Sequence, residues 1–137
     1  MEPLDGDVLR AMFPNTGFSR DERDAHVRRI GFVASRLEHH GVIVIAALIS
    51  PFAESRAFVR GLCRNFVEIY VATPLDECER RDTKHLYAKA RRGEIGDFTG
   101  ITSPYEPPEH PELVIQTTEC TVDEAVAKVL DTLDARR

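Results

Sequence analysis

The sequence is poor in lysine, and it lacks a basic tail. Lysine occurs three times, so the other 15 of the 18 basic residues are arginine. Arginine has a planar fork that pairs bidentately with phosphate or sulfate, whereas lysine is a point charge. The net charge is -5 and the arginines are interleaved with acids, which does not match the electrostatic footprint of a nucleic-acid-binding protein. We therefore expect a small anionic ligand and no nucleic acid, although a GC-rich genome and solvated helix faces would explain most of these arginines equally well.

Cysteines and long apolar runs are also scarce. Cys63, Cys78 and Cys120 are odd in number and widely separated. They form neither a Cys-x-x-Cys pair nor a Cys/His cluster with zinc-ligand spacing, so no metal site is expected. The first residues contain neither a basic region nor an apolar stretch, and the longest apolar run is too short to span a bilayer. The sequence therefore predicts a soluble, cytoplasmic protein without a membrane partner.

Apolar patterns predict at least three strands within one domain, because 137 residues with 42% hydrophobic composition suit a single core. Residues 41–49 are continuously apolar and β-branched after a glycine, which is typical of a strand buried on both faces of a parallel sheet. Residues 66–71 and 113–117 are shorter strand candidates. We expect one domain over residues 1–137.

Capping residues indicate helices between these strands. Ser19 and Glu22 form a capping box, followed by apolar residues at helical spacing, which predicts a helix over about 19–40. Thr73 before a proline predicts an N-cap, and Thr121 with Glu124 predicts a second capping box before the last helix. Strands that alternate with helices favour an α/β layered fold with a parallel sheet.

A long polar segment, residues 93–111, is rich in glycine, proline, threonine and acids and has no periodicity. Loops of this length are usually functional or disordered. Phe98 is its central bulky aromatic residue, and it either packs under the loop or offers a face on which a base stacks. Basic residues crowd the approach, which suits a mobile lid over phosphates and equally suits a solvated helix face; they are Arg80, Arg81, Lys84, Arg91 and Arg92.

Two turns are candidates for a site at the sheet edge. Asp5, Gly6 and Asp7 fall where a strand would end, so Asp7 is a metal-shell ligand or a general base, unless the segment is a plain turn. Residues 49–52 follow the predicted buried strand and open a helix, so their amides either face an anion or form an ordinary strand-to-helix turn. Arg23 and Arg28 lie five residues apart on one helix, so one of them reaches a ligand while the other is solvated.

Read in chain order, these segments resemble the adenylylsulfate kinase family, from residue 4 to the C-terminal helix. The resemblance is carried by several separate motifs in register. They are Leu4-Asp5-Gly6-Asp7 with Arg10, Gly17-Phe18-Ser19, Arg28-Arg29-Ile30, Ile49-Ser50-Pro51-Phe52, Thr73-Pro74-Leu75, Leu86-Tyr87, Gly93-Glu94-Ile95, Phe98-Thr99-Gly100-Ile101 and Pro104-Tyr105-Glu106.

The resemblance implies a three-layer P-loop NTPase-like fold, and transfer of the γ-phosphoryl group of Mg-ATP to the ribose 3′-hydroxyl of adenosine 5′-phosphosulfate. It also implies a homodimer with Mg²⁺ accompanying ATP. Asp7 is the implied catalytic residue, which orients or deprotonates the 3′-hydroxyl. The implied substrate-binding residues are Arg10, Phe18, Arg23, His26, Ile49, Ser50, Lys84, Phe98 and Thr99, and the implied nucleotide-binding residues are Arg81 and Cys120.

The sequence also departs from the family pattern. The family has a strand and a Gly-x-x-x-x-Gly-Lys-Ser/Thr loop before its Asp-Gly-Asp motif, and this sequence contains no Gly-Lys pair. We therefore expect a fold without its first strand and P-loop, with unpaired strand edges and no recognisable ATP site. Val8 and His26 stand where the family has asparagine, and Asp97 where it has glycine.

Three interpretations follow from these departures. The first is a kinase whose sequence here lacks its N-terminal portion. The second is a catalytically inactive, nucleotide-binding or oligomerising relative. The third is one subunit of a composite site that a P-loop partner completes.

Overall fold

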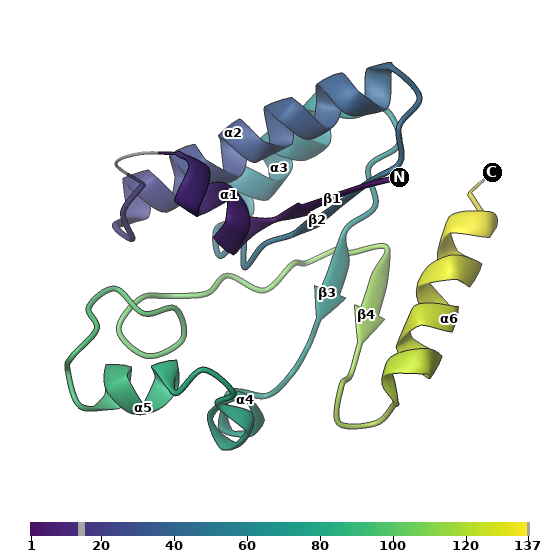
Figure 1. Cartoon of the computed structure of the whole chain (residues 1–137). Coiled ribbons are helices and arrows are strands. Elements are labelled where there is room, and N and C mark those ends of the chain that lie inside the picture. The colour runs from purple at the N-terminus through teal and green to yellow at the C-terminus, as the bar shows by residue number, and fades with distance from the viewer. Residues whose placement is uncertain (14–15, 137) are drawn as a thin grey trace.

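The computed structural model describes residues 1–13 and 16–136, in which helices and short strands alternate along the chain (Figure 1). The elements, in chain order, are β1 (Glu2–Asp5), α1 (Gly6–Met12), α2 (Arg20–His39), β2 (Val44–Ala47), α3 (Ala53–Leu62), β3 (Ile69–Val71), α4 (Leu75–Arg81), α5 (Leu86–Arg91), β4 (Leu113–Ile115) and α6 (Val122–Asp134).

The strands form two separate parallel sheets. β1 pairs with β2, with Leu4 opposite Ala46, and β3 pairs with β4, with Tyr70 opposite Val114. Each described strand has one partner strand. The α/β class and the parallel pairing predicted from the sequence are confirmed, but the strands are divided between two sheets instead of sharing one.

A small apolar core lies between the first sheet and α2. Leu4, Ile30 and Ala34 are buried in it. Helix α3 packs along α2 (Figure 1), and Gly31 makes this close approach possible, because a Cβ atom there would lie 2.3 Å from Val59 Cγ2. The first sheet and its two long helices therefore form the tightly packed part of the molecule.

The strand predicted over residues 41–49 is both shorter and less buried than expected. Strand β2 covers four residues, and the side chains of Ile43, Ile45 and Ile49 remain more than half exposed. The prediction of burial on both faces was wrong for the described chain, because α2 covers one face and these isoleucines stay open to solvent. A continuous apolar run does not reveal which of its faces the chain covers.

Two of the three predicted helix caps are confirmed. Ser19 and Glu22 form a complete capping box at the start of α2, and Thr121 and Glu124 form another at α6. The third was wrong, since α4 begins at Leu75 with Pro74 as its N-cap. The Thr73 hydroxyl instead lies 2.6 Å from the Thr117 hydroxyl, across the ends of β3 and β4.

Residues 93–111 form a turn-rich loop, as predicted, that contains one isolated bridge between Thr99 and Ser103. Beyond β4, α6 has no buried residue, and its apolar side chains at Val122, Val126 and Leu130 are more than half exposed. Among the described residues, no helix combines the length and the apolar character that crossing a membrane requires.

Candidate functional site at the carboxyl end of β1

The turn after β1 carries the first predicted site residues. The Asp5 carboxylate accepts hydrogen bonds from the Asp7 and Val8 amides at 2.9 and 3.0 Å, so Asp5 caps α1 and Asp7 lies in its first turn. A Cβ atom at Gly6 would lie 2.6 Å from Leu48 Cδ2. Glycine is therefore what allows α1 to begin against the end of β2, at the carboxyl edge of the sheet.

Asp7 forms an ion pair with a residue from the distant α4–α5 turn. Lys84 Nζ lies 2.8 Å from Asp7 Oδ2, and both side chains are largely exposed. The hydrogen bond from Lys84 and its charge hold the pKa of Asp7 below its ordinary value, and Asp7 raises the pKa of Lys84 in turn. Asp7 is thus a carboxylate, able to accept a hydrogen bond, at neutral pH.

Two arginines flank the exposed ring of Phe18. The guanidinium carbon of Arg10 lies 4.5 Å from the ring centroid and that of Arg23 lies 5.4 Å from it. Phe18 itself is 54% exposed. Arg10 donates a hydrogen bond to the Gly17 carbonyl at 2.5 Å. This part of the site therefore combines an accessible aromatic face with two positive charges.

Arg23 is buried, and its guanidinium group donates to neutral oxygens. Its exposed fraction is 7%, and its guanidinium donates to the Phe18 carbonyl at 2.7 Å, to the Thr99 hydroxyl at 3.0 Å and to the Asp97 carbonyl. Burial lowers the pKa of Arg23. Among the described residues no carboxylate hydrogen-bonds to Arg23 or forms an ion pair with it, although the negative charge of Asp97 acts to raise its pKa. Such a buried cation favours an added anion.

The contacts of Arg23 bring residues 97–99 of the long loop against the start of α2. Next to them, the ring of Phe98 packs edge-on against Tyr87, with 5.0 Å between centroids. Burial raises the pKa of Tyr87 to about 12. Phe98 is therefore packed against Tyr87, and its second possible role, stacking on a base, stays a prediction.

His26, on α2, lies beside the turn after β1. It is 2% exposed, and its Nε2 atom lies 3.3 Å from the Gly6 carbonyl. Its Nδ1 atom has no hydrogen-bond partner among the described residues. Burial, followed by the charge of Arg10, lowers the pKa of His26. The ring is thus a neutral, buried group with one unused nitrogen.

Ile49 and Ser50 follow the end of β2, at the same sheet edge as Asp7. Ile49 is 62% exposed, and Ser50 has a left-handed backbone with a φ of 44°. In the described part of the chain, no hydrogen bond, ion pair or ring contact joins either residue to Phe18, Arg10 or Arg23. The structure therefore places them at the edge but does not bring them into contact with Arg10 or Arg23.

Arg81 and Cys120 form a second, separate group at the end of β4. Arg81 donates to the Thr117 hydroxyl at 3.3 Å and to the Thr117 carbonyl at 3.2 Å, and Cys120 Sγ lies 3.3 Å from the Gln116 carbonyl. Both predicted nucleotide-binding residues thus share the carboxyl edge of the second sheet. Within residues 1–13 and 16–136, no group of three or more acidic, histidine or cysteine side chains is arranged to hold a metal ion.

The sequence left open whether Arg23 or Arg28 reaches a ligand, and the two residues have different partners. Arg28 pairs with Asp24 at 2.7 Å and with Glu54 at 3.0 Å, so its charge is already neutralised away from Phe18. Sequence reasoning missed Tyr87 as the neighbour of Phe98, although Tyr87 belongs to a motif that carried the resemblance.

The comparisons with known proteins agree on one family. The family model described as adenylylsulphate kinase matches residues 1–116. The adenylyl-sulfate kinase of Microcystis aeruginosa strain NIES-843 is 52% identical over 134 residues, which are 97% of this chain and 74% of the relative. That of Synechococcus sp. strain JA-3-3Ab is 51% identical over 97% of this chain and 76% of its own length.

A solved structure shares the fold. The Mycobacterium tuberculosis APS kinase CysC, in complex with AMPPNP and APS, matches with a TM-score of 0.92 and 43% identity, covering 97% of this chain and 79% of that one. This agreement confirms the predicted P-loop NTPase-like fold class. The chain therefore belongs to the adenylylsulphate kinase family.

Proposed function

We propose that this chain binds adenosine 5′-phosphosulfate and, with ATP as the phosphoryl donor, forms the 3′-phosphorylated product. The observation that supports this most strongly is Arg23, a buried cation that forms no salt bridge with the described residues and lies beside the exposed ring of Phe18. An adenylate ester of sulfate has both features that such a pair attracts, an anion and a flat aromatic base. The proposal joins this local chemistry to the family membership.

The anion would lie near Arg10 and Arg23, whose guanidinium groups donate only to neutral oxygens in the described chain. Guanidinium groups pair bidentately with phosphate and sulfate oxygens. The adenine would stack on Phe18, with Phe98 as the second face once its loop closes over the base. Stacking on an aromatic side chain tolerates any base, so the arginines and the pocket edges at Ile49 and Ser50 would supply the selectivity.

Asp7 would receive the hydrogen bond of the ribose 3′-hydroxyl and orient that oxygen for attack. Its pKa is lowered by Lys84, so it is ionised at neutral pH and ready to accept a proton as the oxygen attacks. Lys84, 2.8 Å away, would then counter the negative charge that accumulates at the transferred phosphoryl group. Phosphoryl transfer depends mainly on positioning and on charge neutralisation, and this pair contributes to both.

The donor side of the proposal is the ATP site, to which we assign Arg81 and Cys120 at the end of β4. The described residues gather no metal-binding cluster of their own, so Mg²⁺ would bind through the phosphates of ATP rather than in a protein cage. A homodimer, which the family resemblance implies, is part of the same proposal, and sedimentation equilibrium would measure it.

The binding step is tested by titration calorimetry with adenosine 5′-phosphosulfate and, as a control ligand, AMP. We expect the sulfate ester to bind more tightly than AMP. Arg23→Gln should weaken its binding by about 10- to 100-fold, the size expected for hydrogen bonds to a charged group. Arg28→Gln is the matched control on the same helix, and it should bind as the parent chain does. Equal affinities of both variants would contradict the assignment of Arg23.

The transfer step is tested by a coupled assay with Mg-ATP, with and without an added segment that carries a Gly-x-x-x-x-Gly-Lys-Ser/Thr loop. Turnover in either mixture supports the kinase function. Binding without turnover in either mixture would favour a catalytically inactive nucleotide-binding module. Turnover that appears only with the segment would favour a site completed by a P-loop element.

A further inference from the structure

The turn after β2 is held in a conformation that side chains rarely adopt. Ser50 has a φ of 44° although it is not glycine, and such residues persist only where their surroundings fix them. Phe52, two residues on, is 2% exposed and lies under the guanidinium of Arg20 at 4.2 Å. Phe52 fixes the end of the turn that leads into α3. The Ser50 carbonyl, at the start of the turn, needs a separate partner.

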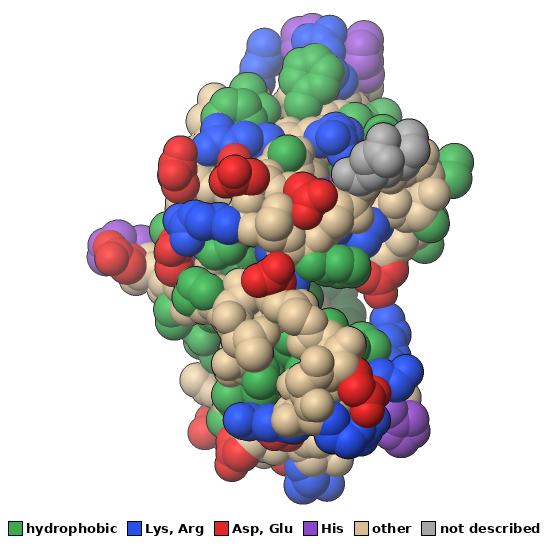
Figure 2. Space-filling model, turned by 90° about the vertical axis from the view of Figure 1, so that its left-hand side faces the viewer, with side chains coloured by type: hydrophobic (Ala, Val, Ile, Leu, Met, Phe, Trp, Pro, Cys, Tyr) green, Lys and Arg blue, Asp and Glu red, His purple; other side chains and the backbone are tan. Residues whose placement is uncertain are grey.

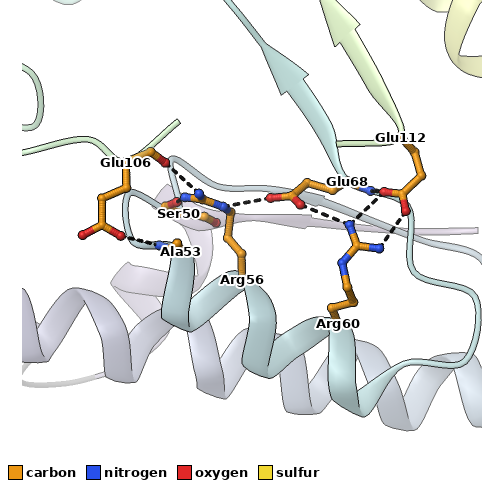
Figure 3. Close-up of polar contacts among 7 residues, drawn as sticks. All are labelled: Ser50, Ala53, Arg56, Arg60, Glu68, Glu106 and Glu112. Carbon is orange, nitrogen blue, oxygen red and sulfur yellow. Dashed lines mark hydrogen bonds and ion pairs between the residues drawn. The ribbon is translucent and has the colours of Figure 1, made fainter. Parts of the chain in front are cut away.

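Arg56, in the second turn of α3, is that partner (Figure 3). Its Nη1 atom donates to the Ser50 carbonyl at 2.7 Å and its Nη2 atom donates to the Glu106 carbonyl at 2.6 Å. Its Nε atom forms an ion pair with Glu68 at 2.8 Å, and its side chain is only 10% exposed. One guanidinium therefore joins the β2 turn, the long loop and the segment before β3.

Glu106 completes the connection from the loop side. Its amide donates to the Pro51 carbonyl at 2.8 Å, and its carboxylate accepts from the Ala53 amide at 2.7 Å. Helix α3 has no capping side chain of its own at this end, so the loop supplies its cap. The turn and the loop are thus fixed to each other through Arg56 and Glu106.

Arg60, one helical turn later, shows what Arg56 does in addition to stabilising the fold. Arg60 also pairs with Glu68, at 3.1 Å, and binds Glu112 at 2.6 Å. Neither of its partners belongs to the β2 turn or to residues 93–111. The two arginines therefore share a helix, a charge and one acidic partner, and they differ in their contacts with the proposed substrate-binding segments (Figure 3).

We infer that Arg56 is a positioning residue for substrate binding: it holds the Ser50 turn and the Glu106 end of the long loop in the arrangement that receives adenosine 5′-phosphosulfate, without touching the ligand. This inference rests on the proposed function. Lysine keeps the charge near Glu68, but its single nitrogen cannot reproduce both hydrogen bonds to the Ser50 and Glu106 carbonyls together with the ion pair to Glu68. A small displacement of a substrate-positioning group is enough to cost about 100-fold in rate or affinity.

The test compares Arg56→Lys with Arg60→Lys in the full chain, by calorimetry with adenosine 5′-phosphosulfate and by thermal unfolding. We expect Arg56→Lys to bind at least about 10-fold more weakly and Arg60→Lys to stay within about 2-fold of the parent chain, since only Arg56 sets the geometry of the turn. The unfolding midpoints should fall by similar amounts in both. Equal binding by the two variants would overturn the inference, whereas a parent chain that does not bind the ligand would instead contradict the proposed function.

A second measurement needs no variant and so does not depend on how well Arg56→Lys folds. Amide hydrogen exchange of the parent chain is followed with and without ligand at Ala53 and Glu106, whose amides join the turn to the loop. Ligand should slow exchange at both. The control amides are Arg64 and Asn65, which donate to the Glu38 carboxylate beyond the other end of α3, and these should not change. Unchanged exchange at Ala53 and Glu106 in a chain that binds ligand would refute the role of Arg56.

Discussion

The two halves of the molecule are stabilised in different ways. Residues 1–62 bury apolar side chains of β1, α2 and the α3 start, whereas residues 63–136 bury little beyond Ala90 and Ile115. The second half is tied to the first largely through charged side chains, and in Figure 2 the outline narrows between the part with α1–α3 and the part with α4 and α5. The packed half is therefore a scaffold, and polar contacts position the other half on it.

The candidate site lies across this junction. Asp7 belongs to the packed half and Lys84 to the other, and Arg23 joins α2 to Thr99 in the long loop. Polar contacts of this kind depend on geometry and are weakened by salt more than apolar packing is. A ligand held by residues of both halves would therefore stabilise the arrangement of one half on the other.

The largest expected effect is a loss of stability when a core side chain of the packed half is shortened. Ile30 is 1% exposed in the core of α2, so Ile30→Ala should reduce the free energy of unfolding by about 2–5 kcal/mol, through lost transfer energy and a cavity. Leu130→Ala is the matched change in the other half, because Leu130 is 55% exposed on α6. It should change stability by less than about 0.5 kcal/mol.

Urea unfolding followed by circular dichroism measures both variants. If Leu130→Ala lowered the free energy of unfolding as much as Ile30→Ala, α6 would have to pack against a surface in solution. The contrast between the two halves would then be wrong.

An intermediate effect is expected where the halves are joined by charge. Glu112 is 14% exposed, pairs with Arg60 at 2.6 Å and accepts from the Glu68 amide at 2.7 Å. Glu112→Gln should cost about 1.5–3 kcal/mol, toward the lower end because Arg60 is 38% exposed and partly screened by water. Glu109→Gln, three residues earlier on the exposed loop, is the control and should be close to neutral.

The same pair predicts a pH dependence. Arg60 lowers the pKa of Glu112 from 4.5 to about 2, so the folded state binds the proton less readily than the unfolded chain does. The stabilisation is therefore fully present above pH 4.5 and is lost as the pH falls through about 2. The stability difference between the parent chain and Glu112→Gln should shrink between pH 5 and pH 2.5, and a constant difference would exclude the ion pair as its cause.

The sequence was most informative where structure is set locally. The capping boxes at Ser19 and Thr121 were predicted because each depends on two residues three positions apart. The exposure of Ile43 and Ile45 was not predictable, since it depends on which elements cover β2 and not on the strand itself. The same limit explains Thr73, whose hydroxyl binds Thr117 across 44 residues instead of capping α4.

The candidate site shows the same difference between what local motifs predict and what depends on contacts between distant segments. The family resemblance implied that Arg10, Phe18 and Arg23 belong to one substrate site, and the structure brings these side chains together. The resemblance also placed Arg23 and Phe98 in that site, but the hydrogen bond from Arg23 to the Asp97 carbonyl, across 74 residues, was not predicted. Arg56 was missed too, since its partners Ser50, Glu68 and Glu106 converge only in the fold. The roles in catalysis and binding that we assign to these residues remain predictions.

The smallest expected effect is a pH dependence of stability that His26 causes within the candidate site. His26 is buried, and its folded-state pKa lies below 6.5 because of burial and the charge of Arg10, with Arg29 adding to it. The unfolded chain takes up a proton near pH 6.5 that the folded chain refuses, so the parent loses stability as the pH falls below 6.5, by at most about 1.4 kcal/mol per pH unit. Asparagine does not titrate, so His26→Asn should lack this loss between pH 7.5 and 5.5, a range above that in which Glu112 titrates. Parallel stability curves for the two proteins would show that His26 is protonated as readily in the fold as outside it, and that burial and the charge of Arg10 do not disfavour its charged form.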